Sequence, residues 1–368
     1  MRTDLLDYPL PEQAIAQHPA PQREDARLLV VRRQGVEHHG LRDWVQLVPA
    51  GALVVLNDTR VRRARLAARK TSGGMVELLF LSERSLSNGV KEWIALGHAN
   101  RPLRAGTVLE LAEARLTVLE RTAGPELHLA VHGVEDTEAF IERHGELPLP
   151  PYIRRSAQSD DAERYQTVFA QHLGSAAAPT AGLHLTQAIL AGLEQRSVRI
   201  AHVTLHVGAG TFLPVRADDL DEHPMHAERY SVAPALVAAV AEARARAAPV
   251  VAVGTTVVRA LESARDPERP GHVVPGSRET RLLIQPGYAF GVVDALLTNF
   301  HAPRSTLLAL VSAFIGLERC AAAYRTALAA GYRFLSYGDA TWLPERCAPE
   351  RSAGAALPDS EAASSDAL

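Results

Sequence analysis

Histidines gather in the second half of the chain, where their spacing allows acid–base chemistry. His202 and His206 lie four residues apart in a β-branched segment, so strand alternation places them on one face. His226 follows in a His-Pro-Met-His turn, and His184 and His301 lie in other polar turns. An imidazole can exchange protons near neutral pH. Zinc is the other common use of histidine, but the spacing matches no zinc motif, so no metal site is predicted.

A glycine-rich turn at residues 208–212 directly follows the strand predicted at 198–207. Glycine lets the backbone approach a ligand closely, so Gly208, Gly210 and Thr211 are candidate ligand contacts. The segment lacks the Gly-Lys-Ser/Thr ending of a phosphate-binding loop. A plain tight turn explains it equally well, and both interpretations stay open.

Three further polar clusters follow predicted strands. Ligands of open α/β sheets bind beyond the carboxyl ends of strands, near helix N-termini, so these clusters together predict one binding site. Arg259 and Glu262 lie three residues apart on the helix after the second cluster and can face one site or each other. The candidate contacts are Asn57, Asp58 and Arg60, then Gly254, Thr255, Thr256 and Arg259, and then Asn299 and His301.

Basic residues concentrate between positions 60 and 70, where six of eleven residues are Arg or Lys. The whole chain has a net charge of −3, so any surface for a polyanion must be a local patch. A solvated face is the alternative explanation of such a run. The candidate phosphate contacts are Arg62, Arg63, Arg65, Arg69, Lys70, Arg154 and Arg155.

These residues are carried by two textures of sequence. Between about 61 and 144, short alternating segments separated by glycine turns predict a small antiparallel barrel or sandwich, with strands at 75–81, 93–96, 107–111, 115–119 and 126–131. Elsewhere strands alternate with helices, which predicts a mostly parallel sheet covered by helices. The strands there are expected at 51–57, 198–207, 250–253, 281–284 and 292–297, and the helices at 232–248, 257–264, 305–316 and 318–330.

The expected fold is therefore a mixed α/β main domain with an inserted small β-barrel, because the strand at 51–57 precedes the barrel. The predicted boundaries are 1–60 with 149–345 for the main domain and 61–148 for the barrel, joined by a proline-rich connector. Residues 346–368 are poor in aromatics and rich in Ala, Ser and Asp, and we expect a disordered tail.

The composition indicates a globular protein of the cytoplasm. The chain has 368 residues, 47% of them hydrophobic, as in globular proteins. We expect two free thiols, Cys320 and Cys347, in a reducing cytoplasm. The start resembles no signal peptide and no run of about 18 apolar residues exists, so we expect no contact with a membrane.

Twelve short motifs in one order resemble the S-adenosylmethionine:tRNA ribosyltransferase-isomerase family of queuosine biosynthesis. With Asp7-Tyr8 near the start, the matching stretches extend to Asp339 and cover about nine-tenths of the chain, and the set is far more specific than any single motif. The motifs are NDTRV (57–61), HGELPLPPYI (144–153), ERYQT (163–167), APTAGLH (178–184), TLHVG (204–208), HPMH (223–226), AVGTT (252–256), LESA (261–264), PGY (286–288), TNFH (298–301), STLL (305–308) and SYGD (336–339).

The resemblance implies that the ribosyl part of S-adenosylmethionine is joined to 7-aminomethyl-7-deazaguanine at the wobble position of a tRNA. Adenine and methionine leave, and epoxyqueuosine forms. The sulfonium acidifies the adjacent ribose carbon, so the site needs acid–base groups and must exclude water. S-adenosylmethionine is then a co-substrate, and neither a metal nor a permanently bound cofactor is expected.

The resemblance also gives the polar residues expected roles. His206 or His226 would transfer the proton, with Glu228 or Asp339 as an orienting group or alternative base. The donor pocket would be lined by the glycine and threonine turns and by Asp58, Arg60, His184, Asn299 and His301. The basic residues would contact the tRNA backbone. We expect the protein to be a monomer. Three rivals stay open: a metal-dependent hydrolase, a tRNA-binding module without catalysis and a conventional methyltransferase.

Overall fold

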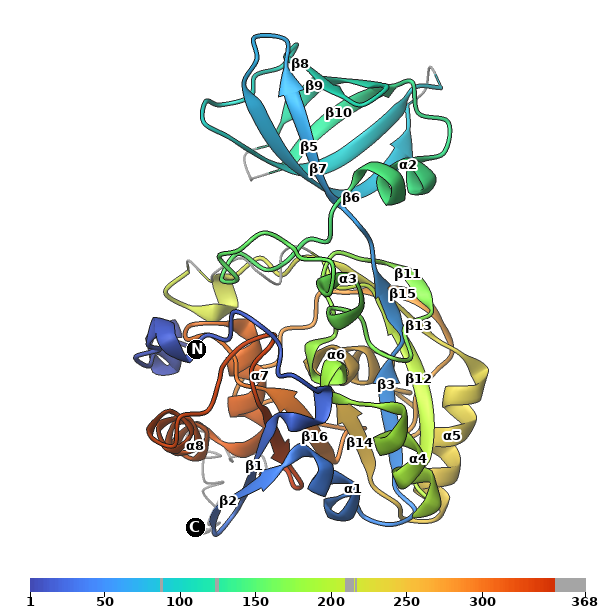
Figure 1. The fold of residues 1–368 in the computed structure, drawn as a ribbon. Helices are drawn as coiled ribbons and strands as arrows, with labels where there is room; N and C mark the ends of the chain where they lie inside the picture. Colours follow the sequence, from blue (N-terminus) through green and yellow to red (C-terminus); the bar gives the residue numbers. More distant parts are fainter. Residues whose placement is uncertain (87–88, 123–125, 209–214, 216, 348–368) are drawn as a thin grey trace, which may run out of the picture.

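A nine-stranded mixed sheet forms the centre of the main domain (Figure 1). The computed structural model describes residues 1–86, 89–122, 126–208, 215 and 217–347. The strands of this sheet are β1 (Arg27–Arg32), β2 (Gly35–Gly40), β3 (Leu53–Asn57), β12 (Arg199–Leu205), β13 (Glu228–Val232), β14 (Val250–Val253), β15 (Gly276–Thr280), β16 (Ala295–Asn299) and β17 (Ala340–Leu343). Their order is β15-β13-β12-β3-β14-β16-β17-β1-β2. The central strands β12, β3, β14 and β16 are parallel, whereas β13, β15 and β2 add antiparallel edges.

Helices cover both faces of this sheet, as the burial of its central strand requires. Leu53 and Val55 of β3 pack with one set of helices, and the alternate residues Val54 and Leu56 pack with the other. The first set is α5 (Pro234–Ala245), α6 (Thr255–Ser263), α7 (Thr306–Ile315) and α8 (Leu317–Ala329), and the second is α1 (Trp44–Leu47) and α4 (Gln187–Gln195). No single described helix is long and apolar enough to cross a membrane; α7 and α8 together meet the length and composition, with a 112° bend between them.

Short elements complete the chain. They are α2 (Thr137–His144), α3 (Asp161–Arg164), β4 (Thr59–Val61), β11 (His172–Ser175) and the 3-10 helices η1 (Thr3–Leu6), η2 (Glu12–Ala14), η3 (Arg23–Asp25), η4 (Leu41–Asp43), η5 (Thr180–His184) and η7 (Leu220–Glu222). Strands β4 and β11 pair in parallel and form a small separate sheet next to the main one.

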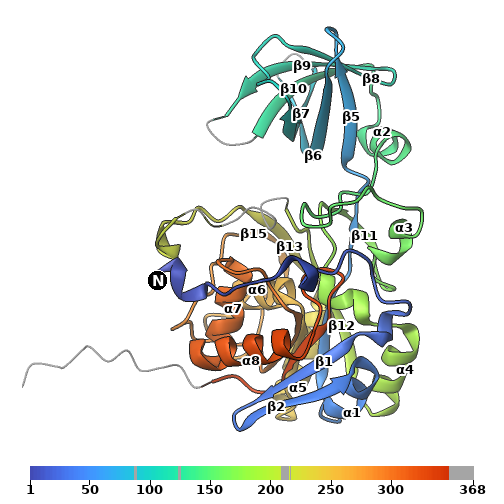
Figure 2. The same ribbon diagram turned by 60° about the vertical axis from the view of Figure 1, so that its left-hand side comes forward.

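Six antiparallel strands close into a barrel that stands on the main domain (Figure 2). They are β5 (Arg65–Lys70), β6 (Met75–Ser85), β7 (Lys91–Ala99), β8 (Val108–Leu111), β9 (Ala114–Arg121) and β10 (Glu126–His132). Closure pairs the edges of the sheet. In the core, the Trp93 ring lies between Phe80 and Phe140 of α2, with centroids 5.3 and 5.8 Å away. The barrel and α2 therefore share one hydrophobic core.

The barrel interrupts the main domain through two adjacent chain segments. Residue Arg65 at the start of β5 exchanges backbone hydrogen bonds of 3.1 and 2.8 Å with Glu146 on the returning segment. All six barrel strands lie inside the proposed insertion, 61–148. At the other end of the main domain, Arg346 donates to the Phe290 carbonyl and Cys347 N donates to the Phe314 carbonyl at 2.8 Å. The first two residues of the proposed tail thus contact the domain, and 348–368 lie outside the described residues.

The expected fold class is confirmed, with local corrections. Strand β5 was hidden in the basic run, because Arg65 and Arg69 lie on the outside of the barrel strand. The prediction of a strand at 281–284 is wrong. The strand that pairs with the sheet is β15, and the apolar residues after it pack against the core without pairing with another strand. The predicted cap at Ser305 is confirmed, since its side chain accepts from Leu308 N. Both cysteines are free.

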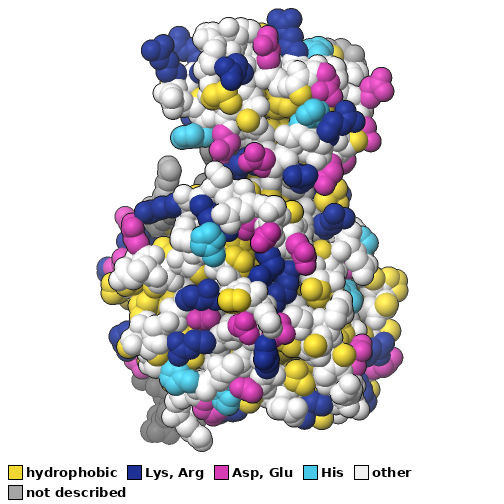
Figure 3. Space-filling model, in the orientation of Figure 1, with side chains coloured by type: hydrophobic (Ala, Val, Ile, Leu, Met, Phe, Trp, Pro, Cys, Tyr) yellow, Lys and Arg dark blue, Asp and Glu magenta, His cyan; other side chains and the backbone are white. Residues whose placement is uncertain are grey.

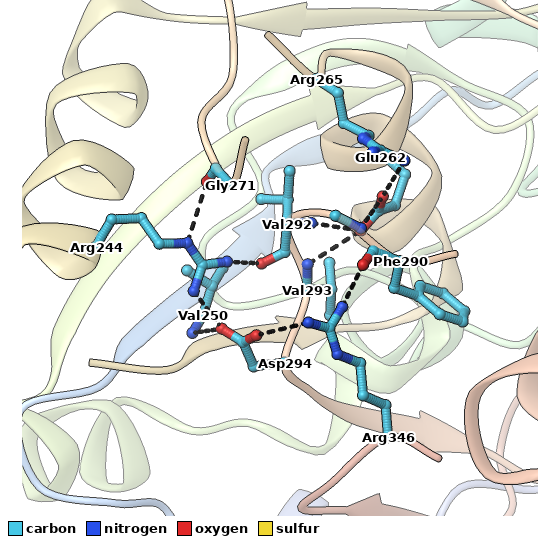
Figure 4. A network of polar contacts seen from close by, with 11 residues as sticks. Arg244, Val250, Glu262, Arg265, Gly271, Phe290, Val292, Val293, Asp294 and Arg346 are labelled. Carbon is cyan, nitrogen blue, oxygen red and sulfur yellow. Dashed lines mark hydrogen bonds and ion pairs between the residues drawn. The ribbon is translucent and has the colours of Figure 1, made fainter. Parts of the chain in front are cut away.

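A buried carboxylate fixes the loop that leads into β16 (Figure 4). The Glu262 side chain on α6 is completely buried, and its oxygens accept hydrogen bonds from Gly291 N, Val292 N and Val293 N at 2.9, 2.9 and 3.0 Å. Beside it, Asp294 accepts from Val250 N at 2.9 Å and from Arg244 at 2.6 Å. These contacts hold α6, β14 and β16 in one arrangement, and the candidate site depends on all three elements.

We expect Glu262→Ala to lower the free energy of unfolding by roughly 2–4 kcal/mol, because three buried N–H groups lose a charged acceptor. Urea unfolding followed by circular dichroism measures this loss. The control is Arg265→Ala, since this arginine is 45% exposed and lies 3.8 Å from Glu262. It should cost less than about 1 kcal/mol. Equal losses in the two variants would contradict the assignment.

Candidate active site

A cavity of about 190 Å³ opens beyond the carboxyl ends of β14 and β16. This is the place where open α/β sheets bind ligands. Its wall also includes η5, the segment after β16 and residues 335–336. Of the candidate ligand contacts, it brings together Gly254, Thr255, Thr256, Arg259, Asn299 and His301.

Gly254 makes the turn from β14 into α6 at the cavity wall. Its φ of +92° lies in a region that other residues rarely adopt, and its N–H donates to the Leu297 carbonyl at 2.8 Å. Helix α6 can therefore begin at Thr255 with its first turn on the cavity. The same helix presents Arg259 one turn later.

Asn299 ends β16 with a buried amide that has one unused oxygen. Its Nδ2 donates to His184 Nε2 and to the Leu335 carbonyl, both at 3.1 Å. Because Nε2 accepts, His184 is neutral, and burial lowers the pKa of this imidazole to about 4. Among the described residues, Asn299 Oδ1 has no hydrogen-bond partner. The cavity wall thus offers an acceptor, while His184 supports Asn299 from behind.

His301 is also held in a neutral state. Its backbone is fixed by two tyrosines: His301 N donates to Tyr324 Oη at 3.1 Å, and Tyr8 Oη donates to the His301 carbonyl at 2.5 Å. The ring nitrogen Nε2 lies 2.9 Å from Thr298 Oγ1. Burial lowers the pKa of His301 to about 3, so this ring offers hydrogen bonds rather than a charge.

Glu228 and Arg259 form a buried ion pair behind the cavity. Glu228, the first residue of β13, accepts from Gly208 N at 3.1 Å and from Arg259 Nη1. Arg259 Nε donates to the Leu282 carbonyl at 3.1 Å. The pair also borders a second cavity of about 40 Å³, which is lined by His226 as well. The sequence allowed Arg259 and Glu262 to face one site together or to contact each other. The structure has neither arrangement, since each of the two side chains binds its own partners.

His206 lies in a different place from the cavity. The prediction that His202 and His206 share one face is confirmed, and they line an open groove of about 720 Å³ together with Thr204 and Asp58. The ring nitrogen His206 Nδ1 lies 2.8 Å from Thr59 Oγ1. Burial lowers the pKa of His206, and neighbouring arginines lower it further. The single pocket expected from the sequence is therefore divided, with His206 and Asp58 on the groove side.

Two further candidates hold the backbone instead of lining the cavity. Asn57 Oδ1 accepts from Leu205 N at 3.0 Å, and its Nδ2 donates to the Leu205 carbonyl at 2.9 Å, which ties β3 to β12. The Asp339 oxygens accept from Arg27 N at 2.9 Å and Arg333 N at 2.8 Å. In this position Asp339 fixes the backbone of two segments, and its role as an orienting group or alternative base stays a prediction.

The basic residues are less free than the sequence indicated. Several are paired: Arg62 lies 3.0 Å from Glu138, and Arg155 makes a bidentate contact of 2.5 and 2.8 Å with Asp161. The other engaged cations are Arg65 on the Leu149 carbonyl, Lys70 on the Arg101 carbonyl and Arg154 on Glu12. Arg60, Arg63 and Arg69 are exposed. On the face drawn in Figure 3, basic and acidic side chains are intermixed over both domains.

The glycine-rich turn is described only in part. Gly208 contacts Glu228 as given above, whereas Gly210 and Thr211 lie outside the described residues. Within the described part of the chain, no three His, Cys, Asp or Glu side chains are grouped so that they could hold a metal ion.

Comparison with known proteins assigns the chain to a family. The model of the queuosine biosynthesis protein family matches residues 3–343. The chain belongs to that family. A Sorangium cellulosum relative is 53% identical over 92% of this chain and 98% of its own, and an Aromatoleum aromaticum relative is 50% identical over 93% and 97%. Both are named S-adenosylmethionine:tRNA ribosyltransferase-isomerase.

A solved structure supports the same fold. It is the crystal structure of the S-adenosylmethionine tRNA ribosyltransferase from Thermotoga maritima. It is 33% identical, covers 92% of this chain and 99% of its own, and superposes with a TM-score of 0.51.

Several residues that line the 190 Å³ cavity of this chain were not singled out as site residues from the sequence. Tyr152 and Ser336 line it and share a hydrogen bond of 2.7 Å, and Arg304 lies in its wall. All three fall in or next to recognised motifs, which was the available signal. Gly174 packs on His206: a Cβ at this position would lie 2.6 Å from the ring. Nothing in the spacing of Gly174 indicates that contact.

The buried His184 predicts a loss of stability in acid. Its pKa is about 4 in the folded chain and near 6.5 when unfolded, so below pH 6.5 the unfolded state binds more protons. Its contribution to the free energy of unfolding is complete above pH 6.5 and falls by about 1.4 kcal/mol per pH unit toward pH 4. His184→Gln should remove this contribution to the pH dependence. Between pH 7 and pH 5 the free energy of unfolding of the variant should therefore fall by roughly 2 kcal/mol less than that of the wild type.

Urea unfolding at the two pH values gives this comparison. The control is His98→Gln, an exposed barrel position that should keep the wild-type pH dependence. If His184→Gln and the wild type lose equal stability on acidification, His184 is not held neutral in the fold.

Proposed function

We propose that this chain is an S-adenosylmethionine:tRNA ribosyltransferase-isomerase. It transfers the ribosyl part of S-adenosylmethionine to 7-aminomethyl-7-deazaguanine at the tRNA wobble position, giving epoxyqueuosine, adenine and methionine. The observation that carries the proposal is the family match over residues 3–343, with relatives of this name that are about half identical over nine-tenths of both chains.

The cavity suits the donor molecule. A proton must leave the ribose carbon next to the sulfonium, and adenine leaves more easily when its ring nitrogens are protonated or hydrogen-bonded. His301 and Asn299 present uncharged hydrogen-bonding groups in a wall that otherwise includes many apolar residues. Such a wall excludes water from the reacting carbon. We therefore assign the donor to this cavity.

The groove suits the acceptor. The attacking amine must be neutral, and a neutral imidazole can take its proton. His206 has a lowered pKa and lies near Arg229, whose exposed charge suits a phosphate backbone. Arg60, Arg63 and Arg69 are the other exposed cations for this role. His226, at the smaller cavity, and Glu228 stay the alternative proton-transfer groups.

The setting of the enzyme is part of the proposal. A tRNA substrate and two unpaired cysteines fit the cytoplasm. We expect a monomer with no permanently bound cofactor and no metal, which size-exclusion chromatography with light scattering and elemental analysis of the purified chain would test.

Incubation of the purified chain with S-adenosylmethionine and tRNA carrying the aminomethyl-deazaguanine should yield epoxyqueuosine, adenine and methionine in equal amounts. Mass spectrometry of nucleosides and small molecules measures all three. A relative of established activity serves as the positive control. A product that gains only a methyl group would indicate a conventional methyltransferase, and an unchanged base would refute the proposal.

Two single variants should separate the donor cavity from the acceptor groove. Asn299→Ala should raise the KM for S-adenosylmethionine roughly 10-fold, because a buried acceptor is lost, with the KM for tRNA little changed. His206→Ala should lower kcat or raise the KM for tRNA and leave the KM for S-adenosylmethionine within about twofold. Steady-state kinetics with each substrate varied in turn decides between them. The reverse pattern would exchange the two assignments.

A further inference from the structure

Arg259 has one nitrogen left for a ligand. Two of its three nitrogens are bound, Nε to the Leu282 carbonyl and Nη1 to Glu228, which fixes the plane of the guanidinium. Among the described residues, Nη2 has no hydrogen-bond partner, although the side chain is only 7% exposed. A buried charged donor of this kind requires an acceptor. The two contacts therefore fix the guanidinium in one orientation and leave Nη2 for an anionic ligand.

The space around Arg259 restricts what that ligand is. The residue lies between the cavity of about 190 Å³ and the smaller one of about 40 Å³. The smaller space has room for water, whereas the larger one has room for part of an organic molecule. An arginine selects an anion, and S-adenosylmethionine carries a single anionic group, the carboxylate of its methionyl part.

We infer that Arg259 Nη2 binds the carboxylate of S-adenosylmethionine, with Glu228 as the residue that positions the guanidinium. The inference rests on the proposed function, because that function supplies the donor molecule. The methionyl end would then lie beside α6, and the unused oxygen of Asn299 would accept from an N–H group of the same molecule. Arg259 thereby makes the cavity selective for the intact amino acid end of the donor.

Arg304 is the competing cation in the same wall. Its side chain is 40% exposed and its Nη1 lies 3.9 Å from Asp7. Solvent weakens the attraction of such a group for a carboxylate. The geometry thus favours Arg259, and Arg304 provides a matched control with the same charge in the same cavity.

The test compares two donors that differ only in this group, S-adenosylmethionine and its decarboxylated form, S-adenosyl-3-(methylthio)propylamine. Calorimetric titration of the full chain should show that the wild type binds the carboxylated donor roughly 10- to 100-fold more tightly. In Arg259→Gln the ratio should fall below about threefold, mainly through weaker binding of S-adenosylmethionine. Arg304→Gln should keep the wild-type ratio.

Arg259→Gln leaves the buried Glu228 carboxylate without its partner, so the variant could fail to fold. The double variant Glu228→Gln/Arg259→Gln removes both charges, and it should fold and show the same loss of selectivity. Equal binding of both donors by the wild type, or a wild-type ratio in the folded double variant, would overturn the inference. Equal binding by a wild type that forms epoxyqueuosine rejects only the role of Arg259, whereas a chain that forms no product and binds neither donor rejects the proposed function as well.

Discussion

Four parallel strands end side by side at one edge of the main sheet, and the candidate site depends on that constraint. The hydrogen-bonded register of β12, β3, β14 and β16 brings segments almost 250 residues apart in the chain to one edge. Each strand then needs a polar turn, because its last backbone groups lose their ladder partners. Asn57 supplies some of those partners, and Gly254 and Asn299 place their turns on the cavity. The same edge therefore produces both the fold and the binding surface.

The divided site follows from the period of a strand. Successive side chains point to opposite faces, so a shift of one residue moves a group across the sheet. His206 faces the groove, whereas Val207 beside it lines the cavity. From the sequence, the polar residues after each strand could be identified, and so could the shared face of His202 and His206. Which face borders the cavity depends on helices and loops distant in the sequence, so spacing alone could not give it.

The elements themselves were more predictable than their pairings. Alternation and glycine turns gave most strands of the barrel, and Ser305 gave the start of α7. Strand β5 was missed because its outward positions carry arginines, and an exposed basic run and an outward strand face have the same composition. The partners of Arg155 and Asp339 were equally hidden, since Asp161 and the Arg27 backbone are brought to them only by tertiary packing. A free cation and a buried ion pair cannot be distinguished in one sequence.

The buried polar groups of the main domain differ in how completely they are hydrogen-bonded. The carboxylate of Glu262 has a full set of donors, and the Asp339 oxygens each accept a backbone N–H. Asn299 Oδ1 and Arg259 Nη2 are buried without partners among the described residues, which costs roughly 1–3 kcal/mol for each group. Because burial also keeps His184 and His301 uncharged, the charge in the cavity wall comes from arginines and not from histidines. A donor bound in this cavity would meet a charge that is constant around neutral pH, and the acid–base dependence of the proposed reaction would then arise in groups outside the cavity wall, such as His206, or in the acceptor amine.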